Sequence, residues 1–388
     1  MNYYNPKINI FFLIVIGLEI LTTSCKKDSS NEPIPMFQPT PYEFEIPFGF
    51  PTKMNIPDDN PMTVEGVELG RYLFYDGRIS GRTHTDSMMS CATCHLQANS
   101  FECGINHPTY QGGYTFGATG IHTHHVMLPL INLVWNSTGY LWNGKIYPKN
   151  PDHKYRNIED LTWMAILAPH EMNSDTNKAK LLIQNTPGYP ELFKKAFGTE
   201  VVTVDRMGKA IAQFIRTFIS YNTKFDKYMK GEIQLTSQEL QGFVLFTTEE
   251  GADCFHCHGG FGNPLWTTNL YYNNGKDSVF NDPFDRYSIS GDPNTKGAYK
   301  ATTLRNIELT GPYMHDGRYK TLEEVIKFYS HGLVWTPQID PLMHHIANGG
   351  IQLTQAEKDA LFAFIKTLRD EEFLVNPSFG KPEKFPDE

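Results

Sequence analysis

Two segments of the chain, 91–95 and 254–258, share the pattern C-x-x-C-H. Two thiols three residues apart can reach the two vinyl groups of one porphyrin, and the adjacent imidazole can then ligate the iron from the same side. A zinc site would need both cysteine pairs to converge on one ion and would leave the two histidines unused. The pattern therefore predicts two covalently bound haem c groups. The predicted attachment thiols and proximal imidazoles belong to Cys91, Cys94, His95, Cys254, Cys257 and His258.

Helices are expected to position both segments. Residues 65–75 precede the first segment and 236–247 precede the second, while 205–229 places apolar residues at helical spacing between them. Two further helices are predicted over 321–330 and 354–368, and the alternation typical of strands is confined to short pieces. Capping boxes mark three of the helix starts, at Thr236 with Glu239, Thr321 with Glu324 and Thr354 with Glu357. The expected fold class is therefore mainly α with long loops.

The composition indicates a globular protein of two to three domains. The chain has 388 residues, of which 40% are hydrophobic and 20% are charged. Its 31 glycines and 25 prolines suit a fold rich in loops. The formal net charge of −9 excludes a protein that binds the phosphate backbone, so no nucleic-acid partner is expected.

The N-terminal residues have the features of an export signal. Lys7 precedes an apolar run over 10–21, which is short for a membrane span of ~20 residues. Cys25 follows three small polar residues and resembles the acceptor cysteine of a bacterial lipoprotein; a plain cleaved signal and an uncleaved anchor are the alternatives. We therefore predict a signal peptide over 1–24 and a lipid-anchored, proline-rich tether over 25–54, which would place the protein in the periplasm.

Over about residues 55–370 the chain resembles the bacterial di-haem cytochrome c peroxidase family, including its MauG-like branch. The stretches that carry the resemblance are Leu130–Asn132, Leu141–Gly144, Ala168–Met172, Arg216-Thr217, Phe225-Asp226, Thr303–Asn306 and Leu309–Arg318. The resemblance implies two cytochrome c-like haem domains. The first, 55–225, would hold the peroxidatic haem, and the second, 226–375, the electron-transfer haem.

The resemblance also assigns roles to single residues. Trp142 would relay electrons between the haems, with simple core packing as the alternative. Glu171 would act as general acid and base in heterolytic cleavage of the peroxide O–O bond, against a solvated glutamate at a helix end. Arg305 would pair with a haem propionate, against a surface salt bridge. His315 would pack against the second haem or one of its propionates.

The distal ligands stay open at the level of sequence. Tyr329 lies on the apolar face of the helix predicted over 321–330 and occupies the place of a distal ligand of the second haem. Tyrosine is the residue of the MauG-like branch, whereas Met314 and Met343 are alternative ligands. The histidine cluster at 122–125 lies in the loop where a gating distal histidine would sit, and a surface cluster explains it equally well.

Two departures from the family pattern affect the expected function. Leu161 replaces a glutamine near the active-site glutamate, which makes the distal pocket less polar. Val126 replaces an asparagine that helps to hold calcium, although Thr310 and Pro312 could still offer carbonyl groups. Calcium binding is therefore left open. Dimers are common in the family, and the sequence does not choose between a monomer and a homodimer.

Three functions are compatible with these residues. The first is an exported peroxidase that reduces hydrogen peroxide with electrons from a small cytochrome c or copper protein. The second is a MauG-like enzyme that oxidises a protein partner through a high-valent haem state, which Tyr329 and Leu161 favour. The third is a di-haem electron carrier without catalytic activity, which the presence of Glu171 argues against.

Overall fold

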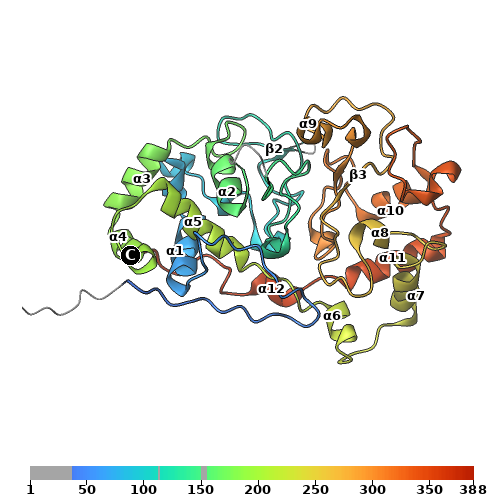
Figure 1. Cartoon of the computed structure of the whole chain (residues 1–388), viewed down its shortest axis with the longest axis horizontal. Coiled ribbons are helices and arrows are strands. Elements are labelled where there is room, and N and C mark those ends of the chain that lie inside the picture. Colours follow the sequence, from blue (N-terminus) through green and yellow to red (C-terminus); the bar gives the residue numbers. More distant parts are fainter. Residues whose placement is uncertain (1–36, 112–113, 150–154) are drawn as a thin grey trace, which may run out of the picture. The chain divides into compact units, whose positions relative to one another are not determined.

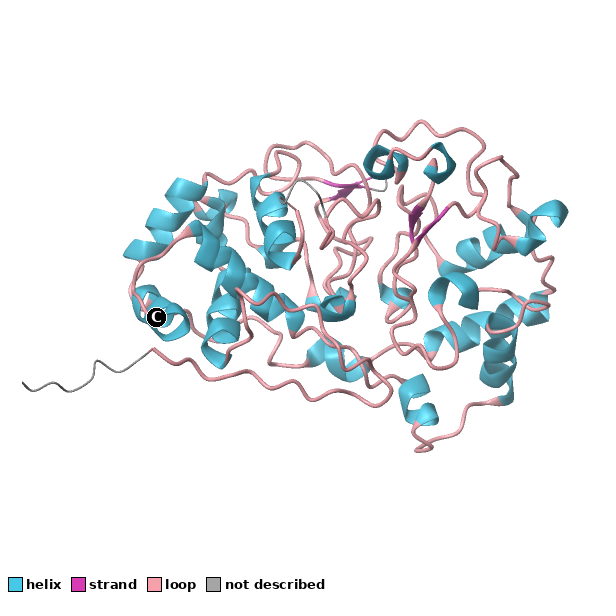
Figure 2. Cartoon of the chain, viewed as in Figure 1, coloured by secondary structure: helices cyan, strands magenta, loops and turns pink. Residues whose placement is uncertain are grey.

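The computed structural model of the 388-residue chain describes residues 37–111, 114–149 and 155–388 (Figure 1). The predicted signal peptide and Cys25 lie outside these residues. Within the described ranges, helices joined by long loops dominate, and strands form only two small two-stranded antiparallel sheets (Figure 2). The predicted class, mainly α with long loops, is confirmed.

The helices follow the chain as two groups around the two C-x-x-C-H segments. Those of the first half are α1 Val64–Tyr75, α2 Ile158–Leu167, α3 Thr176–Asn185, α4 Tyr189–Phe197 and α5 Val204–Arg216. Those of the second half are α6 Lys224–Met229, α7 Ser237–Phe246, α8 Phe255–His258, α9 Tyr287–Ser290, α10 Leu322–His331, α11 Gln355–Lys366 and α12 Glu371–Val375. The strands are β1 Tyr110–Gln111 with β2 Tyr114–Thr115, and β3 Tyr271–Tyr272 with β4 Tyr299–Lys300.

Local capping explains why three helices begin where the sequence predicts. In α7, α10 and α11 the threonine before the first turn accepts a hydrogen bond from the third backbone N–H. The glutamate at that third position accepts one from the threonine's own N–H, so two otherwise unpaired donors are satisfied in each helix. These starts depend on residues three positions apart and are independent of the rest of the fold.

The prediction of a single helix over 205–229 is wrong, because the first helix ends at Arg216 and a second helix begins at Lys224. The backbone N–H groups of Tyr221 and Asn222 donate to the carboxylate of Asp370, at 2.8 and 3.0 Å, and the hydroxyl of Ser220 donates to it at 2.9 Å. A buried acceptor from the C-terminal part of the chain thus replaces the helical hydrogen bonds of this turn.

Each half has its own hydrophobic core, and both cores are built around the same helix crossing (Figure 1). In the first, α1 packs across α5, and in the second α7 packs across α11. A glycine lies at each contact: a Cβ on Gly70 would overlap the carbonyl of Ala210, and a Cβ on Gly242 would overlap that of Ala360. The two halves therefore use one packing solution, in which glycine lets two helix backbones approach closely.

The end of the chain returns to the first core. Helix α12 contributes Phe373 and Leu374 to the first core, and the guanidinium of Arg71 on α1 donates to the carbonyl oxygens of Pro377 and Gly380 at 2.7 and 2.8 Å.

The predicted domain boundaries remain a prediction. None of the described helices is long and apolar enough to cross a membrane.

Candidate functional site

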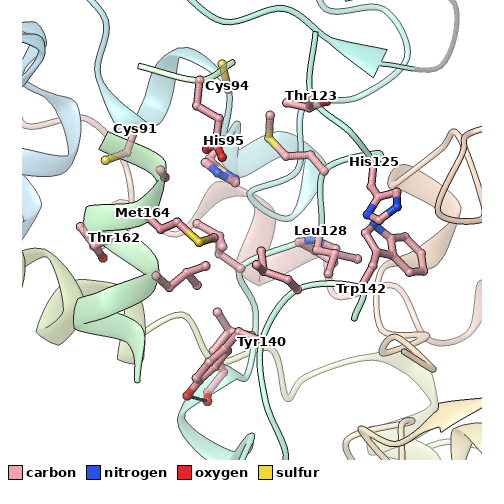
Figure 3. Close-up of a pocket in the computed structure, with 18 of the residues that line it drawn as sticks. Cys91, Cys94, His95, Thr123, His125, Leu128, Tyr140, Trp142, Thr162 and Met164 are labelled. Carbon is pink, nitrogen blue, oxygen red and sulfur yellow. Dashed lines mark hydrogen bonds between the residues drawn. The ribbon is translucent and has the colours of Figure 1, made fainter. Parts of the chain in front are cut away.

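The first C-x-x-C-H segment lines a cavity of about 400 Å³ between α2, α5 and the loop 123–145. Figure 3 shows Cys91, Cys94 and His95 around this cavity, with Met164 of α2 among the residues that face them. The Nδ1–H of His95 donates to the carbonyl oxygen of Phe101 at 2.6 Å. This bond occupies one ring nitrogen, so the other nitrogen is the one available to an iron ion.

The second C-x-x-C-H segment lines a separate cavity of about 200 Å³. Helix α8 carries its histidine, His258, whose Nδ1–H donates to the carbonyl oxygen of Thr302 at 3.0 Å. Burial lowers the pKa of His258 to about 4 and also lowers the pKa of His95, so both imidazoles are neutral at pH 7. Neutral imidazole is the form that ligates a metal.

Both cavities therefore fit a covalently held haem. In each one, two thiols and a neutral, oriented imidazole face a large and mostly apolar space. Burial raises the pKa of Cys91, Cys94 and Cys257 to about 12, which keeps their thiols protonated in the haem-free chain. The predicted attachment residues are thus brought together as two sets.

Glu171 lines the first cavity, in the loop that follows α2. Burial raises the pKa of its carboxyl to about 7, although about a third of the side chain (32%) is exposed. Because the residue lines the cavity, we attribute this exposure to the space in front of His95. Its backbone carbonyl accepts a hydrogen bond from the N–H of Ala118 at 2.7 Å, which fixes the loop. A carboxyl with this pKa can both hold and release a proton near neutral pH.

Two histidines extend the polar side of the first cavity. The Nε2 atom of His170 lies 3.7 Å from a carboxylate oxygen of Glu171. The ring of His124 lies 4.7 Å from that of His170, and both residues line the cavity. Two members of the histidine cluster at 122–125, His124 and His125, therefore line the site, and His125 also bonds to Asp282 at 2.6 Å.

Trp142 lines both cavities (Figure 3). Its indole N–H donates to the carbonyl oxygen of Val126 at 2.8 Å, and its own carbonyl accepts from the N–H of Lys300 at 2.9 Å. Lys300 also lines both cavities, and burial lowers the pKa of its amine to about 7. The tryptophan is thus held from two sides between the two spaces.

His315 lines the second cavity and is buried. Its ring stacks on that of Tyr299 with centroids 3.5 Å apart, and the hydroxyl of Tyr299 donates to Asp282 at 2.7 Å. Burial lowers the pKa of His315 to about 3, so the ring is neutral. The predicted contact of His315 with the second haem stays a prediction, and its position at the cavity wall is compatible with it.

All three candidate distal ligands line the second cavity: Tyr329, Met314 and Met343. The side-chain N–H of Asn274 donates to the Tyr329 hydroxyl oxygen at 2.9 Å and to the Met314 sulfur at 3.7 Å. Burial raises the pKa of Tyr329. The choice among the three residues therefore stays open.

In the structure Arg305 pairs with a carboxylate of the chain itself, and its predicted pairing with a haem propionate stays a prediction. Its side chain is fully buried and donates to both carboxylate oxygens of Asp226, at 2.8 and 2.7 Å, and to the carbonyl oxygen of Pro264 at 2.5 Å. Arg305 lines neither of the two cavities. A buried guanidinium requires a paired carboxylate, and here the pair ties the start of the second half together.

The residues predicted for calcium lie in a turn. Thr310 and Pro312 follow a short 3₁₀ helix, Ile307–Leu309, and the hydroxyl of Thr310 donates to the carbonyl oxygen of Ile307 at 3.3 Å. Val126, the departure from the calcium pattern, accepts the Trp142 bond described above. Calcium binding stays a prediction.

Sequence reasoning missed Lys300 and Asn274, which line these cavities, and Asp282, which bonds to His125 at the wall of the first one. Each lies in or beside a loop of the second half and acquires its role only through contacts with residues 17 to 157 positions away. Neither periodicity nor a short motif signals such residues.

Comparisons with known proteins agree with this geometry. A family model described as di-haem cytochrome c peroxidase matches residues 64–234. The chain is 30% identical over 330 residues to cytochrome c551 peroxidase of Nitrosomonas europaea, covering 83% of this chain and 84% of that protein. It is 28% identical over 323 residues to the methylamine utilization protein MauG of Methylophilus methylotrophus, covering 83% and 87%.

A solved structure gives the same result for the fold. A MauG-like protein associated with microbial copper homeostasis is 31% identical, with a TM-score of 0.75, and the match covers 88% of this chain and all of the other.

Proposed function

The chain belongs to the di-haem cytochrome c peroxidase family, and from that premise we propose that it reduces hydrogen peroxide to water with electrons from a small cytochrome c or copper protein. The family implies two haem c groups and an oxidoreductase. The attachment at Cys91 with Cys94 and at Cys254 with Cys257 is supported by the two cavities that these thiols line.

When bound, the two haem groups would supply the iron centres that accept and pass electrons. The chain's own residues would hold and orient them. His95 and His258 would each present the ring nitrogen that is not bonded to a carbonyl, since Phe101 and Thr302 fix the other one. Mostly apolar walls surround the space in front of these imidazoles.

The observation that carries the proposal is the carboxyl of Glu171 in the first cavity, with its pKa near 7. Reduction of peroxide consumes two electrons and two protons, breaks the O–O bond and releases two waters. Glu171 would take a proton from one peroxide oxygen and deliver it to the other, which makes the departing oxygen a better leaving group. The imidazole of His170 lies beside this carboxylate, with Nε2 3.7 Å from one of its oxygens.

Electrons would reach the first cavity from the second by way of Trp142. The indole lines both spaces and is fixed by its bond to the carbonyl of Val126. The donor would dock near the second cavity, because that is the end of the path farther from Glu171.

Steady-state oxidation of a reduced small cytochrome c by peroxide tests the proposal in the haem-loaded protein. Glu171→Gln keeps the side chain's size and removes its proton chemistry, so turnover should fall by about 10² to 10⁴. Glu200→Gln is the matched control, because Glu200 is exposed and pairs with Lys194 at the surface. Equal turnover in wild type and Glu171→Gln would overturn the assigned role.

A second candidate function, oxidation of a protein partner as in the MauG-like branch, is supported by Tyr329. Tyr329 lines the second cavity, and its hydroxyl oxygen accepts a hydrogen bond from Asn274. Phenolate stabilises ferric iron, so this haem would hold oxidising equivalents longer. Tyr329→Phe should change the visible spectrum of the second haem and shift its potential upward, whereas an unchanged spectrum would leave tyrosine as a packing residue.

We also propose that the protein is exported and held at a membrane by lipid on Cys25. The support is the apolar run over 10–21 and the cysteine that follows it. Cys25→Ala should release the mature protein from the membrane fraction into the soluble fraction. Retention in the membrane fraction would favour an uncleaved anchor instead.

A further inference from the structure

A cluster of metal-binding side chains lies beside the second proposed haem site, and we propose that it binds a divalent transition-metal ion of the zinc or copper(II) class. Its members are Glu249, His256 and His344, and one ligand atom of each lies within 4.8 Å of the others. Among the residues that the structure describes, this is the single such group of three or more. The inference is independent of the peroxidase proposal.

A buried carboxylate orients both histidines of the cluster. Asp253, whose side chain is 5% exposed, accepts from the Nδ1–H of His256 at 2.6 Å with one oxygen. Its other oxygen accepts from the Nδ1–H of His344 at 2.9 Å. Each imidazole therefore keeps Nε2 as the nitrogen with a free lone pair. A carboxylate behind a ligating histidine is the usual partner in metal sites, because it fixes the tautomer and the ring direction.

Glu249, the third ligand, faces Nε2 of His256, the ring nitrogen that is not bonded to Asp253. An oxygen of Glu249 lies 3.6 Å from this Nε2, which is too long for a hydrogen bond. Two ligands that are each ~2.1 Å from one ion in tetrahedral geometry are about 3.4 Å apart, so Glu249 and His256 already have nearly this spacing, and the ligand atom of His344 lies within 4.8 Å of both. The Nε2–H of His345 donates to the backbone carbonyl of Glu249 at 2.9 Å, which holds this loop in place.

The donor set and the charge select the class of ion. Two imidazoles and one carboxylate suit Zn²⁺ or Cu²⁺, whereas Ca²⁺ and Mg²⁺ prefer oxygen ligands. The carboxylates of Glu249 and Asp253 bring two negative charges, which a divalent ion would balance. Glu249 is 61% exposed and His344 is 41% exposed, so water can supply a fourth ligand.

The position of the cluster is itself informative. His256 lies between the two cysteines of the second C-x-x-C-H segment, and Asp253 and His344 line the second cavity. The proposed ion would therefore lie beside the site of the second haem, on a part of the surface that solvent reaches.

Metal titration of the chelator-treated, untagged, haem-loaded protein tests the site. Calorimetry with Zn²⁺ should give one equivalent bound to wild type, and the affinity should fall at least about tenfold in the double variant Glu249→Gln/His344→Ala. The matched control, Glu250→Gln/His331→Ala, changes an exposed neighbour and an exposed histidine of the same half and should bind like wild type. Asp253→Asn should weaken binding about 10- to 100-fold while keeping all three ligands.

A spectroscopic readout on wild type keeps the test independent of variant folding. With one equivalent of Cu²⁺, electron paramagnetic resonance should show hyperfine coupling to two imidazole nitrogens. No stoichiometric binding to wild type, a copper signal without nitrogen coupling, or equal affinity in the double variant and its control would each overturn the proposal. In those cases His256 and His344 would simply be hydrogen-bonded partners of Asp253.

Discussion

The raised pKa of Glu171 predicts that the residue reduces stability at alkaline pH, and that Glu171→Gln removes this cost. Burial raises the pKa from 4.5 to about 7, so the folded protein keeps a proton that the unfolded chain has already lost between these values. The folded state therefore loses stability as pH rises through this window. Each unit of pKa shift corresponds to 1.36 kcal/mol, so this shift can lower the free energy of unfolding by at most about 3 kcal/mol. Because a third of the side chain is exposed, we expect about 1 to 2 kcal/mol.

Denaturant unfolding of the haem-loaded protein at pH 5 and pH 8 measures this effect. Glu171→Gln should gain about 1 to 2 kcal/mol relative to wild type at pH 8 and much less at pH 5. Wild-type turnover should rise through about pH 7 as the carboxyl ionises, and this limb should be absent in the variant. A stability difference that is the same at both pH values would refute the claim that burial raises the pKa of this carboxyl.

Three other changes test the path between the cavities and the packing that supports them. Trp142→Phe should slow donor oxidation and lower the free energy of unfolding by about 1 to 3 kcal/mol, because the buried carbonyl of Val126 loses its hydrogen-bond donor. Stopped-flow traces measure the first effect and unfolding curves the second. Unchanged donor oxidation would exclude the indole from the electron path. Glu159→Gln leaves the buried guanidinium of Arg216 without a counter-charge, so the free energy of unfolding should fall by about 3 to 5 kcal/mol. A decrease below about 1 kcal/mol, as measured for exposed ion pairs, would contradict this. Gly70→Val should cost at least about 1 to 3 kcal/mol by forcing α1 away from α5, and an unchanged melting temperature would show that the crossing can adapt.

Features that depend on neighbouring residues were predictable from the sequence. The three capping boxes fix helix starts within one turn, and the predicted helices at 65–75, 236–247, 321–330 and 354–368 match α1, α7, α10 and α11 to within one or two residues. The C-x-x-C-H pattern likewise names both thiols and the imidazole that meet in one cavity. In each case the chemistry is contained in a few consecutive residues.

Features that depend on distant residues were not predictable in this way. Asp370 interrupts the helix predicted over 205–229 from about 150 positions away. Asp226 pairs with Arg305 across 79 positions of the chain, whereas the family resemblance suggested a haem propionate as the partner of Arg305. His344 joins the cluster of Asp253 across 91 positions. Periodicity cannot reveal such pairs, because each forms only when two parts of the chain have folded against one another.

The most direct test of the peroxidase account is the stoichiometry of donor oxidation in the haem-loaded protein. Hydrogen peroxide is added in known amounts to the enzyme with excess reduced small cytochrome c, and both oxidised donor and remaining peroxide are measured. The account predicts two donor molecules oxidised for each peroxide consumed, with the rate dependent on Glu171 and Trp142. Peroxide consumption without donor oxidation, or no consumption at all, would contradict it.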